Sequence, residues 1–345
     1  MDSQHTPLHL VYASDANYVH IVEVAIASAC VLASRPNDLI VHVLDCGIPD
    51  EMWEAFVNRL TSALSVCPHF VRHVIDMGMF QEASAWHGSL APYARLKLPS
   101  LLPDVEWCVY ADGDTLFVSD PFELQACYNP AISIQGHLDP PKARQDTQAW
   151  CKERGLRLES PNYICSGFVI MNLRRFRERD LECKCLTLLA TYDPVPFVDQ
   201  GVLNILCDDD KGVLPEGWGV PTPEAFAGQG AKSIHFIGEF GVHPWEPGFL
   251  LRKGGYCDAM LAWYACAKAL FGRSRYEVSK TPCSVWYVRH FCTRFIKWTV
   301  WVLRFFPGLR QRLAPIAGRF AYGKQRRCLA TRFWLRAKHD AQVKH

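Results

Sequence analysis

The first 75 residues alternate short apolar runs with segments of helical pattern, and this alternation constrains the fold more than any other feature. Strands that alternate with helices pair in parallel through right-handed crossovers. No GxGxxG segment follows the first strand, so a dinucleotide-binding fold of the usual kind is disfavoured. The sequence therefore predicts an α/β fold with strands Leu8–Tyr12, Leu39–Leu44 and Phe70–Ile75, and with helices Ile21–Ala33 and Asp50 to about Leu64.

The remainder of the body continues this pattern with longer connections. We predict helices over Ala91–Leu98 (stopped by Pro99 and Pro103), within Asp139–Ser160, and over Leu181–Ala190, Phe197–Leu206 and Asp258–Leu270. Strands are expected within Trp107–Val118, Ala131–Gln135, Tyr163–Leu173 and Ser233–Phe236. We expect Arg174–Asp180 to form charged surface and Asp208–Asp210 to form a solvated turn.

Two aspartates, Asp112 and Asp114, follow the apolar strand of Trp107–Val118 and are separated by Gly113. Ligands of open α/β sheets bind at the carboxyl ends of the strands. Two carboxylates on one tight turn can converge on a divalent cation that also takes phosphate oxygens. The DxD segment therefore predicts a metal–diphosphate site, although acidic turns that merely end a strand are more common.

His235 lies at the end of the last predicted strand and begins a loop, up to Trp245, with two glycines and a Pro-Trp pair. A histidine there is more often structural than a ligand, but this loop could let backbone approach a phosphate while His235 binds a metal. Two carboxylates with one imidazole suit Mn²⁺ somewhat better than Mg²⁺. The predicted metal ligands are therefore Asp112, Asp114 and His235.

Charge is distributed unevenly along the chain. Residues 272–345 hold 17 basic and two acidic residues, a net charge of +15, whereas residues 1–271 hold 20 basic and 33 acidic residues, a net charge of −13. The basic tail also carries 13 aromatic residues. We therefore divide the chain into a catalytic domain, 1–271, and a helical tail, 272–345, that binds an anionic membrane surface. Packing of the aromatics onto the body is the alternative, and nucleic-acid binding would not explain the DxD body.

The 15 cysteines are scattered through apolar runs without a CxxC pair, and this is typical of free or buried thiols in a reducing compartment. Residues 1–7 lack the pattern of a signal peptide, and no uncharged run of about 18 residues predicts a spanning helix. We expect a cytoplasmic protein that associates with the cytoplasmic face of the membrane.

Six ordered segments together resemble the family 8 retaining glycosyltransferases. This resemblance implies a GT-A fold, with a mixed, mostly parallel sheet, and transfer of galactose or glucose from a UDP-sugar to a saccharide such as the lipopolysaccharide or lipooligosaccharide core. The segments are VYASDANYV, YARLKLPSLLP, YADGD, YICSGFVIMNL, FVDQGVLN and IHFIGEFGVHPW, between Val11 and Trp245.

The resemblance also implies roles for individual residues. Uracil and ribose would contact Ala13, Asp15 and Asn17, the last two of which could instead only form the turn after the first strand. Asp112 would also contact ribose, and Gly238 would lie in the phosphate loop. The residues implied near the transferred sugar are Arg95, Asp199 and Gln200, although a lone Arg95 could equally lie on a helix surface.

Two positions depart from the family pattern. Cys165 replaces a sugar-binding asparagine, so that contact would be lost or supplied by Ser166, and His243 replaces a lysine that faces the diphosphate. Histidine is only partly charged near pH 7, so leaving-group stabilisation would be weaker or pH-dependent. A non-catalytic UDP-sugar-binding protein is therefore one alternative function.

A haloacid-dehalogenase-type phosphatase is a less favoured alternative, because Leu116 stands where that family needs Thr or Val and no later GDGxND-like block follows. For the glycosyltransferase, retention requires either a covalent intermediate or attack from the face that UDP leaves. Gln200 is an uncharged amide and a poor nucleophile, so we favour front-face attack.

Overall fold

The computed structural model describes residues 6–221, 230–237, 243–244, 263 and 266–271. The chain divides into two compact units, one of residues 1–220 and 230–235 and one of residues 221–229 and 236–345. In the second unit, residues 266–271 are helical, which agrees with part of the helix expected over Asp258–Leu270. The rest of that helix and the tail 272–345 lie outside the described residues, so the proposed domain boundary stays a prediction.

The first unit is built on a seven-stranded sheet with the order β3-β2-β1-β4-β7-β6-β8. Strands β3, β2, β1 and β4 run parallel, β7 is antiparallel to β4 and β6, and β8 is parallel to β6. The predicted mixed, mostly parallel sheet is therefore confirmed. The strands are β1 (Leu8–Ser14), β2 (Leu39–Asp45), β3 (His69–Val74), β4 (Cys108–Ala111), β6 (Ile134–Leu138), β7 (Ile164–Met171) and β8 (Lys211–Val213).

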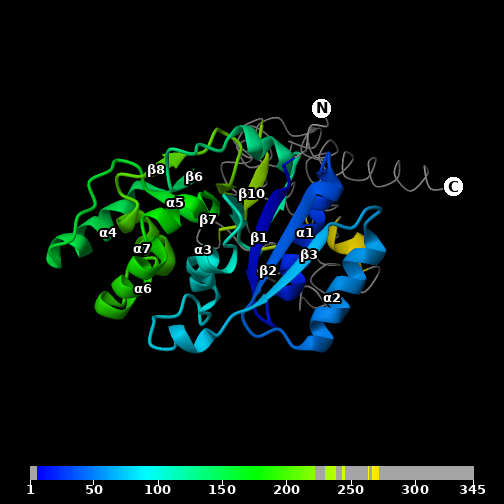
Figure 1. The fold of residues 1–345 in the computed structure, drawn as a ribbon, viewed down its shortest axis with the longest axis horizontal. Coiled ribbons are helices and arrows are strands. Elements are labelled where there is room, and N and C mark those ends of the chain that lie inside the picture. Colours follow the sequence, from blue (N-terminus) through cyan, green and yellow to red (C-terminus); the bar gives the residue numbers. More distant parts are fainter. Residues whose placement is uncertain (1–5, 222–229, 238–242, 245–262, 264–265, 272–345) are drawn as a thin grey trace, which may run out of the picture. The chain divides into compact units, whose positions relative to one another are not determined.

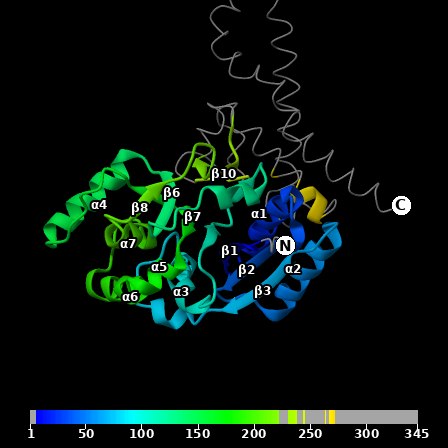
Figure 2. The ribbon, with the colours of Figure 1, turned by 45° about the horizontal axis from the view of Figure 1, so that its top comes forward.

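Helices flank this sheet in two groups. Figures 1 and 2 both show α1 and α2 beside β1, β2 and β3, and α4 to α7 gathered around β6, β7 and β8. Every residue of β7 is buried, as expected for a central strand covered on both faces. The bounds are α1 (Val19–Leu32), α2 (Asp50–Ala63), α4 (Pro141–Glu153), α5 (Leu173–Glu178), α6 (Leu181–Tyr192) and α7 (Val198–Leu206).

A second, three-stranded sheet has the order β5-β10-β9 and carries the rest of the DxD segment. β5 (Thr115–Phe117) directly follows the DxD turn and pairs antiparallel with β10 (Ser233–His235), which places His235 opposite Thr115. The third strand is β9 (Val220–Pro221). A strand pairing thus brings His235 to the turn of Asp112 and Asp114.

Several local expectations differ from the structure. Ala91–Lys97 forms the 3₁₀ helix η3, and Pro99 lies in the first turn of α3 (Leu98–Leu101) instead of ending a helix. Proline is tolerated there because the first helical N–H groups have no partner within the helix. The other short 3₁₀ helices are η1 (Pro36–Asp38), η2 (Met77–Phe80) and η4 (Pro121–Ala126).

Two expectations of exposed surface are confirmed except at one residue each. Arg174–Asp180 is charged surface that largely forms α5 and buries only Phe176. Asp208–Asp210 forms the expected turn, but Asp210 is only 3% exposed. The Asp210 carboxylate accepts hydrogen bonds from Ser133 and Arg179, and from Arg175 at 2.9 Å. Ion pairing offsets the cost of burying this charge, and the pairs link residues too distant in sequence for local patterns to indicate.

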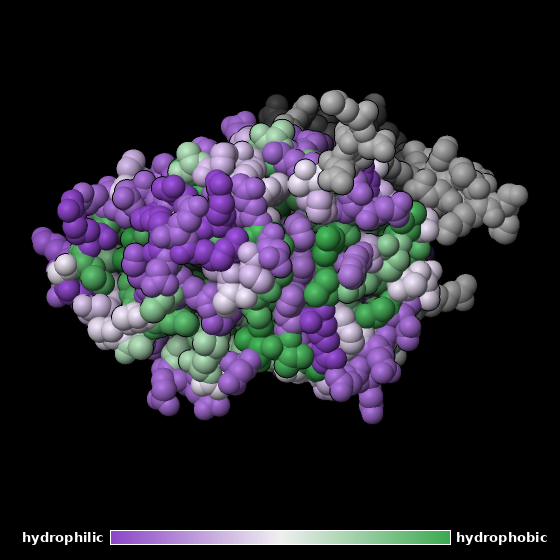
Figure 3. Space-filling model, viewed as in Figure 1, coloured by the Kyte–Doolittle hydropathy of each residue, from purple (hydrophilic) through white to green (hydrophobic). Residues whose placement is uncertain are grey.

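Hydrophilic residues cover most of the face shown in Figure 3, and hydrophobic residues appear on it in separate patches. One core cluster of buried apolar side chains joins residues of the sheet and its helices, including Val11, Leu44, Leu96, Val169 and Leu203. The eleven cysteines within the described residues are free, which confirms the expectation of free thiols there. Among the described helices, none is long and apolar enough to cross a membrane.

Candidate active site

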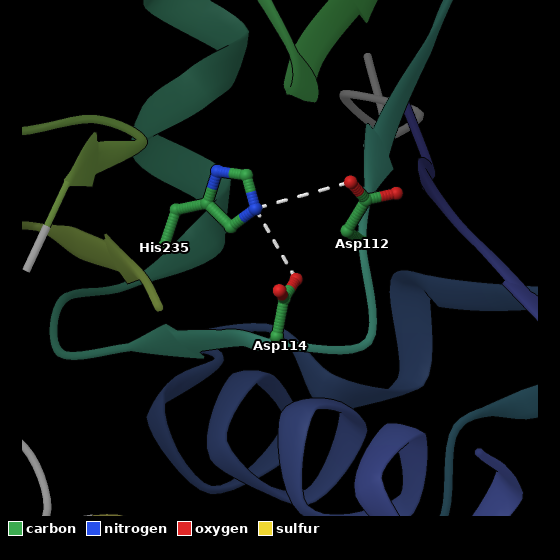
Figure 4. A group of neighbouring side chains, drawn as sticks. All are labelled: Asp112, Asp114 and His235. Carbon is green, nitrogen blue, oxygen red and sulfur yellow. Dashed lines mark ion pairs between the residues drawn. The ribbon is translucent and has the colours of Figure 1, made fainter. Parts of the chain in front are cut away.

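Asp112, Asp114 and His235 converge on one point at the carboxyl end of β4. His235 Nε2 lies 3.2 Å from Asp114 Oδ1 and 3.8 Å from Asp112 Oδ2, and one potential ligand atom from each residue lies within 4.8 Å of the others (Figure 4). Two carboxylates and an imidazole are a donor set for hard or borderline divalent cations such as Mn²⁺ and Mg²⁺. The predicted grouping of these three residues is confirmed, and their side chains fit a cation.

Gly167 on β7 keeps this site open. A Cβ atom at this position would lie 2.1 Å from His235 Cε1 and 2.6 Å from Asp112 Oδ2. The backbone of β7 therefore lies so close to His235 and Asp112 that only glycine fits at this position. The Asp112 amide also donates to the Gly167 carbonyl at 2.8 Å, which holds the DxD turn against β7.

Gly113, between the two aspartates, is required for space and not for a left-handed backbone. A Cβ atom there would lie 2.5 Å from Val22 Cγ2 and 3.1 Å from Tyr18 Cδ1. We predicted only that this glycine permits a sharp turn. The physical reason is the close approach of the DxD turn to α1.

Asp114 and Cys165 both affect the pKa of the His235 imidazole. Burial is the largest single influence and lowers the pKa of His235, but the Asp114 carboxylate and the Cys165 sulfur together outweigh it and raise that pKa well above the ordinary value. An imidazolium can therefore satisfy the carboxylates without a cation, and a cation would replace its Nε2 proton. Both forms of the site are electrostatically compensated.

Arg95 is buried at 1% exposure beside the three residues of the cation site. Its guanidinium donates to Asp112 Oδ1 at 2.8 Å and to the Ser166 carbonyl, and it lies 4.0 Å from the ring centroid of Tyr110. The Tyr110 hydroxyl donates to the same Asp112 oxygen at 3.0 Å. The alternative that Arg95 lies on a helix surface was wrong, and sequence reasoning missed Tyr110, which its position within YADGD could have indicated.

Asp199 lies on the other side of this arginine. Arg95 Nε is 3.1 Å from Asp199 Oδ2, and the aspartate is 2% exposed. Burial raises the pKa of Asp199 to about 6, against the opposing influence of Arg95. Arg95 therefore bridges Asp112 from the DxD turn and Asp199 from α7.

Gln200 is held at both ends of its side-chain amide. Its Oε1 accepts from the Ser166 amide at 3.0 Å, and its Nε2 donates to Asp139 Oδ2 at 2.9 Å. Cys165, the neighbour of Ser166 on β7, has its Sγ 3.7 Å from His235 Nδ1. The structure thus brings Cys165, Ser166, Asp199 and Gln200 together, and it adds Asp139, which no sequence signal indicated.

The residues expected to hold uridine lie at the end of β1, which pairs in parallel with β4. Ala13 is buried, and Asp15 Oδ1 accepts from the amides of Asn17 at 2.9 Å and Tyr18 at 3.0 Å. Asp15 thus forms the turn into α1, as in the alternative interpretation, and Asn17 is exposed. A role of these residues in nucleotide binding stays a prediction.

The two remaining predicted residues cannot be placed at this site. Gly238 lies outside the described residues, and His243 belongs to the second unit. Their expected contacts with a diphosphate also stay predictions.

Comparison with known proteins decides the family. The sequence pattern described as Glycosyl transferase family 8 matches residues 9–247. The chain belongs to this family. A provisionally assigned glycosyltransferase from Haemophilus influenzae is 28% identical over 203 residues, which are 58% of this chain and 59% of that protein. The match thus spans about three fifths of that relative's own length.

Solved structures support the GT-A fold. The galactosyltransferase LgtC, crystallised with donor and acceptor sugar analogues, is 19% identical with a TM-score of 0.61, over 82% of this chain and all of LgtC. The bifunctional glycosyltransferase WbbM is 18% identical with a TM-score of 0.63, over 81% of this chain and 53% of WbbM. At these identities the likeness shows the fold alone, and it matches the fold class expected for family 8.

Membership of family 8 removes the support for a haloacid-dehalogenase-type phosphatase. The phosphatase alternative rested only on a strand followed by two aspartates in a DxD turn. A family 8 chain with a GT-A fold accounts for the same feature.

Proposed function

We propose that this chain is a metal-dependent retaining hexosyltransferase that moves galactose or glucose from a UDP-sugar to a saccharide acceptor. The observation that carries the proposal is the convergence of Asp112, Asp114 and His235 beside Arg95, within a family 8 chain. A bound Mn²⁺, or alternatively Mg²⁺, would neutralise diphosphate charge and stabilise UDP as a leaving group. Those three side chains would hold the cation.

The nucleotide would lie at the carboxyl ends of β1 and β4. In this proposal Ala13, Asp15 and Asn17 contact uracil and ribose, and Asp112 contacts ribose in addition to the cation. Gly238 and His243 would face the diphosphate. The parallel pairing of β1 and β4 supports the first part, because it places both strand ends at one edge of the sheet.

The transferred sugar would lie against β7 and α7. Asp199 and Ser166 would bind its hydroxyl groups, with Cys165 beside them, and Arg95 would position Asp199 and Asp112. Support comes from the ion pairs of the buried Arg95 with the partly exposed Asp112 and the buried Asp199, which orient two carboxylates before any ligand binds.

Front-face attack is the stereochemical course that we propose. Asp199 is the nearest carboxylate in sequence to Gln200, but its ion pair with Arg95 and its burial make it a poor nucleophile. Gln200 is neutral, and its amide is engaged at both ends. The acceptor hydroxyl would instead enter beside the departing phosphate, which takes its proton.

The proposed acceptor is a glycan, the lipid-linked core of lipopolysaccharide or lipooligosaccharide. The similar LgtC structure contains donor and acceptor sugar analogues. The basic, aromatic tail 272–345 suits the cytoplasmic surface of an anionic membrane, where a lipid-linked acceptor would be reached. No nucleic-acid partner is proposed.

The decisive experiment measures transfer from UDP-galactose and UDP-glucose to a lipid-core acceptor extract, with and without Mn²⁺, by mass spectrometry. We expect a product one hexose heavier than the acceptor only with Mn²⁺. Asp114→Asn should remove activity by at least a hundredfold, about 2.7 kcal/mol in the barrier. The matched control is Asp104→Asn, which changes an exposed aspartate to the same amide.

Two results would contradict the proposal. Binding of the UDP-sugar without transfer or hydrolysis under all conditions would favour a non-catalytic sugar-nucleotide protein. Hydrolysis of simple phosphate esters, with no hexose transfer, would return the phosphatase alternative.

A further inference from the structure

The thiol of Cys165 lies beside the imidazole of His235, next to the ring nitrogen that does not face the aspartates. Its Sγ is 3.7 Å from His235 Nδ1, within hydrogen-bonding distance for sulfur. Figure 4 shows that Nε2 of the same ring points to Asp112 and Asp114, with the other ring nitrogen turned away from them. Cys165 is 7% exposed and His235 is 6% exposed, so little water reaches this contact.

The ring has little freedom to choose another orientation. The pairing of β10 with β5 holds the backbone of His235. The backbone of Gly167 lies close to the ring, since a Cβ atom on Gly167 would be 2.1 Å from His235 Cε1. A ring that binds a cation through Nε2 must carry its proton on Nδ1. The Nδ1–H group then needs an acceptor, and Cys165 Sγ lies within hydrogen-bonding distance of it.

We propose that Cys165 is a positioning residue, whose sulfur accepts the Nδ1–H bond of His235 and thereby aims Nε2 at the divalent cation. The inference rests on the proposed function, because it requires that a cation binds at Asp112, Asp114 and His235. It also gives Cys165 a task different from the sugar contact expected at its position. Such outer partners of a metal-binding histidine fix its tautomer and orientation, and their loss weakens binding by about 10–100-fold.

The test measures Mn²⁺ affinity of the full chain without nucleotide or sugar, from the electron paramagnetic resonance signal of free Mn²⁺. For Cys165→Ala we expect a dissociation constant about 10–100-fold higher than wild type. Cys165→Ser retains a polar acceptor and should recover most of the affinity. The matched control is Cys151→Ala, which removes a buried free thiol on α4.

A second readout reports the tautomer directly. Nitrogen-15 spectra of the Mg²⁺-loaded chain, with the His235 signals identified by their loss in His235→Gln, should show a proton on Nδ1 in wild type and in Cys165→Ser. Cys165→Ala should show a mixture of tautomers. A purely structural role of the thiol would lower thermal stability without moving these signals.

The outcomes separate the two proposals. If wild type binds Mn²⁺ and Asp114→Asn does not, but Cys165→Ala matches wild type in affinity and tautomer, the positioning role is overturned and the proposed function stands. If wild type binds no Mn²⁺, both are overturned. Weaker binding in Cys165→Ala with recovery in Cys165→Ser, and wild-type affinity in Cys151→Ala, supports the inference.

Discussion

His235 Nε2 lies 3.2 Å from Asp114 Oδ1, although one residue lies on β10 and the other in the turn between β4 and β5. The contact exists because β10 pairs with β5 directly after the DxD turn. Cation binding at this site therefore depends on backbone positions as well as on the three ligands.

The first prediction concerns the space at Gly167. In Gly167→Ala the new methyl group would lie 2.1 Å from His235 Cε1 and 2.6 Å from Asp112 Oδ2, so the imidazole and the carboxylate must separate. We expect Mn²⁺ affinity to fall by at least about tenfold, because ligand geometry is lost. Equilibrium dialysis measures this.

The control for Gly167→Ala is Gly212→Ala on β8, where a Cβ would meet chiefly the end of the flexible Ile132 side chain, at 2.4 Å. That variant should bind Mn²⁺ like wild type. Unchanged affinity in Gly167→Ala would mean that β7 does not confine the site.

The second prediction concerns the buried arginine. Arg95→Met leaves the buried Asp199 carboxylate without its ion-pair partner at 3.1 Å, and breaking a buried pair in this way costs about 3–5 kcal/mol of stability. Urea denaturation should show this loss. Asp199→Asn in the same chain should restore part of it, because the uncompensated charge is removed.

The control for the arginine uses an exposed ion pair. Lys142→Met removes the partner of Asp146 on α4, where both side chains are exposed, and should cost less than about 1 kcal/mol. Equal losses in Arg95→Met and Lys142→Met would contradict the proposed role of the buried network.

The third prediction separates front-face attack from a covalent intermediate. If Asp199 were the nucleophile, azide could replace its carboxylate in Asp199→Ala and yield a glycosyl azide. We expect no azide adduct above the wild-type background, because Asp199 is ion-paired and buried. Mass spectrometry of the reaction with azide tests this, and an adduct specific to Asp199→Ala would establish double displacement instead.

The fourth prediction concerns three histidines across β1, β2 and β3. His9 Nδ1 lies 2.9 Å from His42 Nε2, and His42 Nδ1 lies 3.0 Å from His73 Nε2. Burial and then the neighbouring histidines lower the pKa of His42 to about 3, and burial also lowers the pKa of His9 and His73.

These groups make the fold sensitive to acid. In the unfolded chain His42 takes up a proton near pH 6.5, whereas in the folded chain it does so only near pH 3. The free energy of unfolding is therefore highest above pH 6.5 and decreases as the pH falls toward 3. The slope is at most about 1.4 kcal/mol per pH unit for each group. Urea denaturation at pH 7, 6 and 5 should therefore show a smaller loss in His42→Leu than in wild type.

The matched control for His42→Leu is His87→Asn, an exposed histidine with a φ of 49° that asparagine tolerates. It should keep the wild-type dependence on pH. The same dependence in His42→Leu and wild type would show that this buried row does not cause the loss.

The local part of the fold follows from sequence patterns. The alternation from Leu8 to Ile75 predicted β1, α1, β2, α2 and β3, and the DxD strand is confirmed as β4. These segments could be predicted because the periodic pattern of a strand or a helix is set by residues close together in the sequence. Local patterns also indicated Asp112, Asp114 and His235 as candidates for one site.

What sequence reasoning missed involves partners distant in the chain. The burial of Asp210 depends on Ser133, Arg175 and Arg179, and helix α5 depends on burying Phe176. Asp139 reaches Gln200 only through the fold of β6 against β7. No local pattern carries these relationships.

By itself, the sequence determined most of the strands and helices of the α/β body and which side chains can do chemistry, because propensity and periodicity are local. Tertiary structure alone decided that Gly167 leaves room for the imidazole, that Arg95 is buried between two acids, and that Cys165 contacts His235 Nδ1. Strand register places Gly167 and Cys165 on β7 and His235 on β10, and packing of η3 against the sheet places Arg95. Both depend on contacts between segments distant in the chain.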